Sequence, residues 1–148
     1  MKGSARVPSR LALDSSVLIA YFLGEPAGQV AKKEIFATTR RDLHCSHLAL
    51  AETFYILCRS KGRGFAAESM ETLERTGYLR PYASTDLDYA AAAYKCDRNL
   101  SLADCYVLAL AKKTRATATF ARKESDLATE EQKRPFDVNL LFLQDLQR

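Results

Sequence analysis

Short apolar runs alternate along the chain with longer segments whose apolar residues recur at helical spacing. The short runs predict strands over residues 11–13, 43–46, 78–82, 116–120 and 138–143. The longer segments predict helices over residues 15–24, 27–38, 46–60, 65–76, 86–98, 102–113 and 122–133. Strands joined by helices pair in parallel, so this order indicates an α/β fold, a three-layer α/β/α sandwich with a short parallel sheet.

Small polar residues and glycines mark the ends of several predicted helices. Ser46 and Thr85 stand where N-caps are needed, and Gly77 stands where the helix over 65–76 must end. Ser101 is placed to cap the helix over 102–113. These residues therefore predict where the helices begin and end.

The K-G-R-G sequence at residues 61–64 separates two amphipathic helices, which we expect to project as a hairpin. Its apolar residues exceed what a hairpin surrounded by solvent requires. They are Tyr55, Phe65, Met70 and Leu73. The hairpin is therefore predicted to be a protein-contact surface and to support a homodimer.

Length and composition favour one domain. We expect a flexible leader over residues 1–10 and a single domain over residues 11–148 of the 148-residue chain. The net charge of +4 permits binding to nucleic acid without requiring it. Asp14, Ser15 and Ser16 interrupt the N-terminal apolar stretch, which argues against a signal peptide, and no run approaches the ~20 apolar residues that span a membrane.

The chain contains four cysteines without a C-x-x-C pair, at Cys45, Cys58, Cys96 and Cys105. A core of this size needs no disulfides, so we expect buried free thiols in a reducing compartment. Together with the absence of a predicted membrane segment, this makes the cytoplasm the expected location.

Three acidic residues lie where the pattern demands apolar ones. Asp14 ends the first predicted strand, while Glu52 and Asp104 lie inside apolar helical runs. An ionised carboxylate near a core is costly, and carboxylates that converge raise each other's pKa unless a cation compensates. An oxygen-rich cluster of this kind suits Mg²⁺ or Mn²⁺, so the three acids are candidate metal ligands.

Two of these acids have a simpler interpretation. Asp14 is also placed to cap the helix that begins at Ser15, and Ser101 with Asp104 has the S-x-x-D spacing of a capping box. Glu52 has no such alternative, because it lies in mid-helix without a basic residue at ±4. The joint occurrence of three acids in three apolar segments favours the metal site.

The motifs that contain these acids resemble those of the PIN-domain ribonucleases, particularly VapC-type toxins and their archaeal relatives. The matching motifs are L-D-S-S-V-L-I-A, L-A-E-T-F-Y and S-L-A-D-C-Y-V-L-A-L-A, and the resemblance extends over residues 11–143. It implies a metal-dependent endoribonuclease that forms homodimers and is neutralised by a VapB-like antitoxin.

By this resemblance, Asp14, Glu52 and Asp104 match the family's first three acidic positions. The fourth acid is expected after the next strand, in a T-x-D-like stretch; here Thr119 is present, but Ala121 stands at the acidic position. Glu124 is the candidate to replace it. Asp126 is the other acid nearby, but we expect it to point elsewhere.

The residues receive the following predicted roles. Asp14 and Asp104 would hold the metal ion, and Glu52 would either ligate it or orient a water as general base. Glu124 would help to bind a second ion. Arg122 and Lys123 would contact the phosphates of the RNA substrate.

Two other functional classes lack their motifs in this sequence, and one alternative stays open. The D-x-D motif of aspartyl-phosphate phosphatases is absent because Ser16 follows Asp14 at +2, and no G-x-x-x-x-G-K-[ST] loop of P-loop proteins occurs. The main alternative is a non-catalytic PIN-like protein that binds RNA or regulates another protein.

Overall fold

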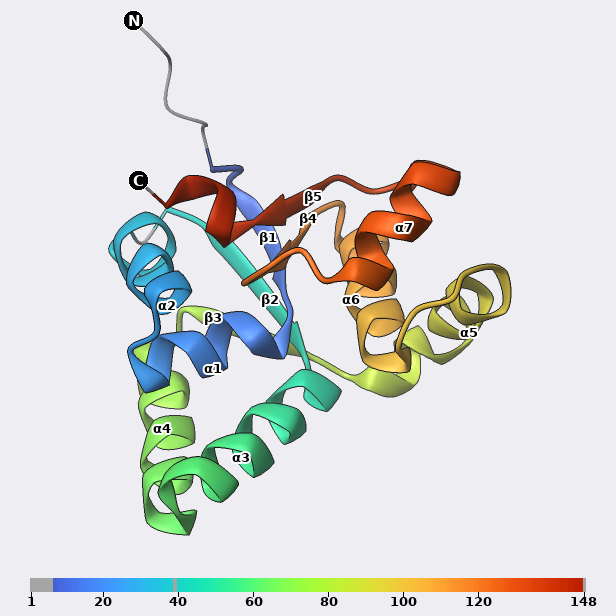
Figure 1. The fold of residues 1–148 in the computed structure, drawn as a ribbon. Coiled ribbons are helices and arrows are strands. Elements are labelled where there is room, and N and C mark those ends of the chain that lie inside the picture. The colour runs from blue at the N-terminus through green and yellow to red at the C-terminus, as the bar shows by residue number, and fades with distance from the viewer. Residues whose placement is uncertain (1–6, 39, 148) are drawn as a thin grey trace, which may run out of the picture.

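The computed structural model describes residues 7–38 and 40–147, and its centre is a five-stranded parallel sheet of order β3-β2-β1-β4-β5 (Figure 1). The strands are β1 (Arg10–Leu13), β2 (Asp42–Ser46), β3 (Leu79–Tyr82), β4 (Thr117–Phe120) and β5 (Leu140–Phe142). The predicted α/β class with a short parallel sheet is thereby confirmed.

Helices connect consecutive strands and flank the sheet (Figure 1). The α-helices are α1 (Ser15–Leu23), α2 (Pro26–Ala31), α3 (His47–Lys61), α4 (Arg63–Thr76), α5 (Asp88–Asp97), α6 (Leu102–Thr114) and α7 (Ser125–Lys133). A π-helical turn follows α2 at Lys32–Phe36, and 3₁₀ turns lie at Ser84–Leu87 and Leu143–Leu146.

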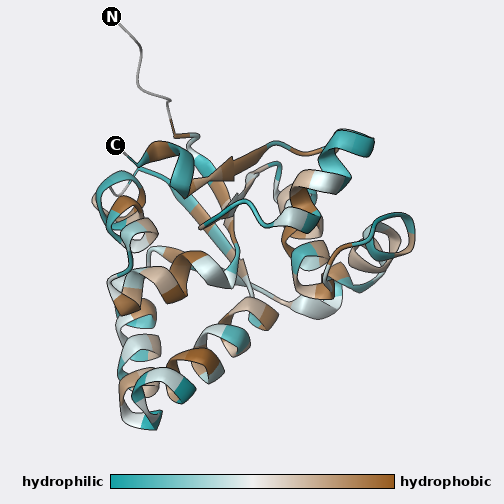
Figure 2. Ribbon diagram, in the orientation of Figure 1, coloured by the Kyte–Doolittle hydropathy of each residue, from teal (hydrophilic) through white to brown (hydrophobic). Residues whose placement is uncertain are grey.

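The two faces of the sheet bury separate hydrophobic clusters, because side chains alternate along each strand. Leu11 and Leu13 of β1 join the cluster that includes residues of α1 and α2, whereas Ala12 joins the cluster of α5 and α6. Figure 2 shows hydrophobic residues along β5, mixed colours along β1 and β2, and hydrophilic residues at the outer end of α7. The structure is therefore a sandwich of three layers.

Three of the predicted caps are confirmed. The hydroxyl of Ser46 accepts from the backbone N–H of Ala49 at 3.1 Å, and that of Ser101 accepts from Asp104 N–H at 3.1 Å. Gly77 ends α4 in the left-handed conformation, with φ of 66°. These bonds satisfy backbone groups that the helix ends leave unpaired.

The predicted cap at Thr85 is wrong. Residues Ser84–Leu87 form a 3₁₀ turn, and α5 begins at Asp88 without a side-chain capping bond. Leu87 is 1% exposed, so this turn serves to bury an apolar side chain between the strand and the helix. The hydroxyl of Ser84, meanwhile, accepts from the backbone N–H of Leu48 at 2.9 Å.

The single helix predicted over 27–38 is also wrong, because α2 ends at Ala31 and a π-helical turn replaces its continuation. The wider turn buries Ile35 and places the ring of Phe36 4.8 Å from that of Tyr21. α2 itself crosses α1 closely, since a Cβ added at Gly28 would lie 1.9 Å from the carbonyl oxygen of Ala20.

Residues 1–6 of the predicted leader lie outside the described residues. The rest of it is attached to the fold: Val7 is buried, Arg41 donates to the carbonyls of Val7 and Pro8 at 2.7 Å each, and Arg10 begins β1. In the part of the chain that the structure describes, no helix has the length and hydrophobicity to cross a bilayer.

All four cysteines are free thiols, as expected, but only two of them are buried. Cys45 and Cys105 lie in the core, whereas Cys58 is half-buried and Cys96 is exposed. The prediction that the thiols are buried is therefore correct for the two that lie on β2 and on the inner side of α6.

Candidate active site

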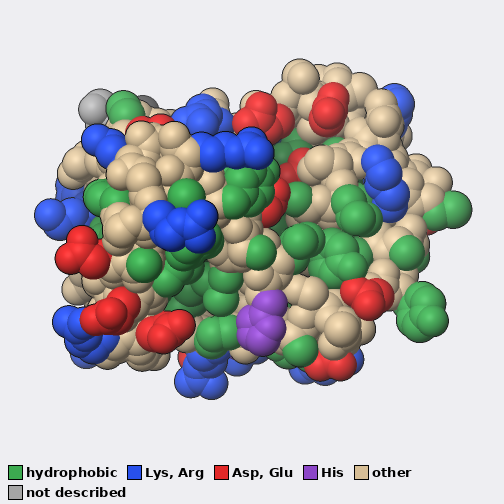
Figure 3. Space-filling model, turned by 90° about the horizontal axis from the view of Figure 1, so that it is seen from below, with side chains coloured by type: hydrophobic (Ala, Val, Ile, Leu, Met, Phe, Trp, Pro, Cys, Tyr) green, Lys and Arg blue, Asp and Glu red, His purple; other side chains and the backbone are tan. Residues whose placement is uncertain are grey.

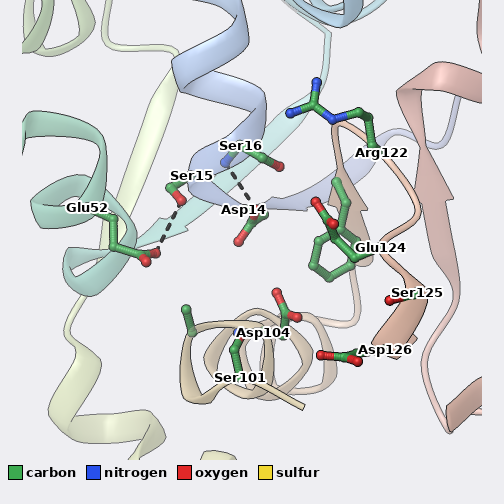
Figure 4. Close-up of a pocket in the computed structure, with 12 residues that line it drawn as sticks. Asp14, Ser15, Ser16, Glu52, Ser101, Asp104, Arg122, Glu124, Ser125 and Asp126 are labelled. Atoms are coloured by element: carbon green, nitrogen blue, oxygen red, sulfur yellow. Dashed lines mark hydrogen bonds between the residues drawn. The ribbon is translucent and has the colours of Figure 1, made fainter. Parts of the chain in front are cut away.

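A pocket of about 310 Å³ lies at the carboxyl edge of the sheet, where ligands bind in open α/β folds. Side chains from the ends of β1 and β4 and from helices α3, α6 and α7 line it (Figure 4). Five of the lining residues are acidic: Asp14, Glu52, Asp104, Glu124 and Asp126. The pocket thus gathers all three acids singled out in the sequence, together with both candidates for the fourth.

Asp14 connects β1 to α1 and forms the back of the pocket. Its backbone N–H donates to the carbonyl of Thr119 on β4 at 2.9 Å, and its Oδ2 accepts from the N–H of Ser16 at 3.0 Å. Asp14 therefore does cap α1, and it also presents its carboxylate to the pocket. The side chain is buried, and this burial raises its pKa.

Glu52 lies in the second turn of α3 and reaches the pocket from the side of β2. Its Oε1 accepts from the hydroxyl of Ser15 at 3.1 Å, which connects α3 to the start of α1 (Figure 4). Burial raises the pKa of Glu52, and the negative charge of Asp14 raises it further. The Ser15 hydroxyl holds the carboxylate in a fixed orientation.

Asp104 lies in the first turn of α6, and its carboxylate points toward Asp14 and Glu124 (Figure 4). Burial and then the charge of Asp14 raise its pKa to about 6. Its backbone N–H takes part in the capping bond with Ser101. As with Asp14, the capping geometry and the pocket position occur together.

Glu124 and Asp126 enter the pocket from the start of α7. Glu124 is the N-cap residue but makes no side-chain capping bond, and its charge raises the pKa of both Asp14 and Asp104. The expectation that Asp126 points elsewhere is wrong, because the first turn of α7 runs along the pocket wall and Asp126 lines it.

Ala121, at the expected position of the fourth acid, cannot present a side chain to the pocket. It is 1% exposed and packs in the core on the α1 side of the sheet. Its backbone N–H donates to the hydroxyl of Ser16 at 3.0 Å, and its carbonyl accepts from Gln144 N–H at 3.0 Å. These bonds fix the backbone after β4, so an acid can reach the pocket only from further along the chain.

The two predicted phosphate-binding residues occupy different surroundings. Arg122 lines the pocket, and its Nη1 is 3.9 Å from Oε1 of Glu25, at the end of α1. Lys123 does not line the pocket: its Nζ is 3.1 Å from Glu131 Oε1 and lies over the ring of Phe142. The structure therefore brings only Arg122 to the acids.

Sequence reasoning overlooked Ser16 and Glu25. Ser16 positions both the Asp14 carboxylate and the backbone after β4, and its place inside L-D-S-S was the available signal. Glu25 has no local sequence signal, because its partner Arg122 lies far away in the sequence.

The donor set of the pocket consists of oxygen atoms, which suits a hard divalent cation. In the described residues, no three His, Cys, Asp or Glu side chains lie close enough together to hold one ion as they stand. Carboxylates that repel one another stand apart until a cation draws them together. Figure 3 shows acidic side chains toward the middle of the face seen from below, next to Lys and Arg side chains.

Comparisons with known proteins identify the family of the chain. The model of the PIN domain family matches residues 11–128. The chain belongs to the PIN domain family. A search of curated proteins found no match.

Solved structures share the PIN fold at low sequence identity. VapC20 of Mycobacterium tuberculosis, a toxin that cleaves the sarcin-ricin loop, superposes with a TM-score of 0.65 at 20% identity, over 82% of this chain and 94% of that one. A toxin–antitoxin complex from Klebsiella pneumoniae gives 0.61 at 21% identity, over 81% and 91%. PAE2754 of Pyrobaculum aerophilum gives 0.52 at 15% identity, over 97% and 96%.

The raised pKa of Asp104 predicts how the stability of this PIN domain depends on pH without added metal. The folded state holds the proton more tightly than the unfolded chain, so this carboxylate destabilises the fold at neutral pH and ceases to do so as pH falls from about 6 toward 3.8. Asp104→Asn should therefore raise the free energy of unfolding at neutral pH by about 1 kcal/mol, with little gain below pH ~4.

Urea unfolding in the presence of a chelator, at several pH values, measures this difference. Asp86→Asn is the matched control, because Asp86 is exposed and lies outside the pocket, and it should shift stability by less than about 0.5 kcal/mol. A loss of stability in Asp104→Asn at neutral pH would contradict the repulsion described here.

Proposed function

We propose that this PIN domain is a divalent-metal-dependent endoribonuclease that cleaves RNA phosphodiester bonds and acts as the toxin of a toxin–antitoxin pair. The observation that carries the proposal is the pocket that Asp14, Glu52, Asp104 and Glu124 share at the carboxyl edge of the sheet. The fold likeness to VapC20 and to a toxin–antitoxin complex supports the toxin role.

Mg²⁺ or Mn²⁺ fits the residues of the pocket. The acidic side chains of the pocket are all carboxylates. Burial and the negative charge of neighbouring carboxylates raise the pKa of Asp14, Glu52 and Asp104, as expected of metal ligands that lack their cation. Asp14 and Asp104 would hold the ion together with Glu52, and Glu124 would supply the fourth acid. When bound, such an ion acidifies a water molecule and offsets phosphate charge.

The protein's own groups would perform the remaining steps. Glu52, oriented by the Ser15 hydroxyl, would either ligate the ion or accept a proton from the attacking water as general base. Arg122 would exchange its contact with Glu25 for the substrate phosphate, which the guanidinium can bind through two hydrogen bonds. We do not assign Lys123 a contact with the substrate, because it does not line the pocket.

The proposed partners are a second copy of the chain and a VapB-like antitoxin. Two of the four apolar residues expected on the hairpin surface belong to the core: Leu73 is buried and Met70 packs against it. A groove of about 380 Å³ lies between α1 and α4. Phe22 and Phe65 line it, together with Glu68 and Glu71. Arg75 also lines the groove and pairs with Glu71, so the groove suits an apolar segment. We propose the cytoplasm as the location, because the RNA substrate and the free thiols fit it.

A non-catalytic PIN domain that binds RNA or regulates a partner is the second candidate. Ala121 in place of an acid favours it, because one ligand of the expected set is missing at that position. Glu124 opposes it, since its charge acts on both Asp14 and Asp104 from α7.

Asp14→Asn and Asp104→Asn should each reduce Mn²⁺- or Mg²⁺-dependent RNA cleavage to background, because each removes a charged ligand from a small oxygen set. Glu52→Gln should lower the rate by about 10²–10⁴-fold through loss of the base. Cleavage of a labelled RNA pool, with and without a chelator, provides the measurement. Asp86→Asn should cleave normally; full activity in Asp14→Asn or Asp104→Asn would refute the proposed site.

Glu124→Gln should reduce both cleavage and Mn²⁺ affinity strongly, whereas Asp126→Asn should have a much smaller effect. The reason is that, of these two acids, Glu124 is the one whose charge raises the pKa of both Asp14 and Asp104, although both line the pocket. Calorimetric Mn²⁺ titration beside the cleavage assay tests the pair. Equal losses in the two variants, or none in Glu124→Gln, would mean that Glu124 does not replace the fourth acid.

A further inference from the structure

Helix α3 carries an aromatic residue and a cation on the same face as Glu52. Tyr55 and Arg59 follow Glu52 at i+3 and i+7, so the three side chains form one line along the helix. Given the rise of an α-helix, Tyr55 lies ~4.5 Å and Arg59 ~10.5 Å along the axis from Glu52. The distance along the helix from Glu52 to Arg59 is therefore one that one or two nucleotides can span.

The ring of Tyr55 is available for contact. Tyr55 is 45% exposed, and the guanidinium carbon of Arg59 lies 5.2 Å from its ring centroid, so the cation covers only part of the ring. Side chains of a helix lean toward its N-terminus, which in α3 adjoins the carboxyl end of β2 (Figure 1). The ring of Tyr55 is therefore exposed about one helical turn beyond Glu52, which itself lines the pocket.

The surroundings of this ring are positively charged. Between Glu52 and Glu68 every charged residue is basic, namely Arg59, Lys61 and Arg63, and all three are exposed. Within the described part of the chain, none of these three side chains forms an ion pair with a carboxylate. An exposed ring beside unpaired cations suits a flexible polyanion whose bases offer flat faces.

We propose that Tyr55 and Arg59 form a binding subsite for single-stranded RNA next to the cleaved phosphodiester. A base stacks on the Tyr55 ring, and Arg59 binds a phosphate of the same strand. Bases inside a duplex cannot stack in this way, so the subsite selects unpaired segments. This inference rests on the proposed ribonuclease function, and it adds two substrate-binding residues on α3 that lie outside the acidic cluster.

The test measures binding of a fluorescein-labelled oligoadenylate to the Asp14→Asn protein by fluorescence anisotropy at fixed salt. Tyr55→Ala should weaken binding by about tenfold or more, because stacking on an aromatic ring is lost. Tyr55→Phe keeps the ring and should bind like its parent, whereas Tyr55→Leu keeps apolar bulk without the ring and should bind like Tyr55→Ala. Arg59→Ala should also weaken binding.

Tyr89→Ala is the matched control, because Tyr89 is 93% exposed on α5 and lies outside the pocket; its affinity for the oligoadenylate should not change. Melting curves check that each variant folds. Unchanged affinity in Tyr55→Ala and Tyr55→Leu, or an equal loss in Tyr55→Phe, would overturn the subsite.

Light scattering on the same variants separates RNA binding from protein contact. If Tyr55→Ala lowers the oligomeric mass while its RNA affinity stays the same, this face of α3 is a protein interface and the inference is wrong. Binding to the Asp14→Asn protein requires no cleavage. The subsite and the proposed ribonuclease activity can therefore fail independently of each other.

Discussion

Repulsion among carboxylates that share one small pocket is the constraint on which this molecule's architecture depends. Asp14, Glu52, Asp104 and Glu124 belong to four separate segments, and only the carboxyl edge of a parallel sheet brings the ends of such segments together. The N–H of Ser16 and the hydroxyl of Ser15 donate to Asp14 and Glu52 and hold them in place, but burial and the charge of neighbouring carboxylates outweigh these bonds and raise both pKa values. A fold that maintains this arrangement without a cation gives up stability, which a divalent ion would restore on binding.

Much of the fold follows from local patterns in the sequence. Strands β1 and β5 could be predicted because they contain short apolar runs. The ends of α3, α4 and α6 could be predicted because Ser46, Gly77 and Ser101 have strong conformational preferences. The π-helical turn after α2 and the 3₁₀ turn before α5 could not, since burial of Ile35 and Leu87 in a tertiary core decides them. The local sequence does not indicate which side chain of such a turn will be buried in the core.

The site was predictable to the extent that its residues break the apolar pattern. Asp14, Glu52 and Asp104 stand out as acids in hydrophobic runs, whereas Glu124 and Asp126 lie in a polar segment where an acid attracts no notice. The position of α7 depends on the backbone after β4, which Ser16 and Gln144 fix through bonds to Ala121. Because these bonds join segments that are distant in the sequence, no local pattern could predict that Asp126 lies in the pocket and Lys123 outside it. Glu25 beside Arg122 is likewise a contact between distant segments.

The most direct test of the central claim is the melting temperature of the protein as a function of Mn²⁺ concentration, starting from chelator-treated protein. If the carboxylates bind the ion, the melting temperature should rise continuously with Mn²⁺ concentration, by the equivalent of about 2.7 kcal/mol when the free ion reaches about a hundred times its dissociation constant. The double variant Asp14→Asn, Asp104→Asn should start from a higher melting temperature and rise little. A melting temperature of the unaltered protein that does not respond to Mn²⁺, or an equal rise in the double variant, would contradict the central claim.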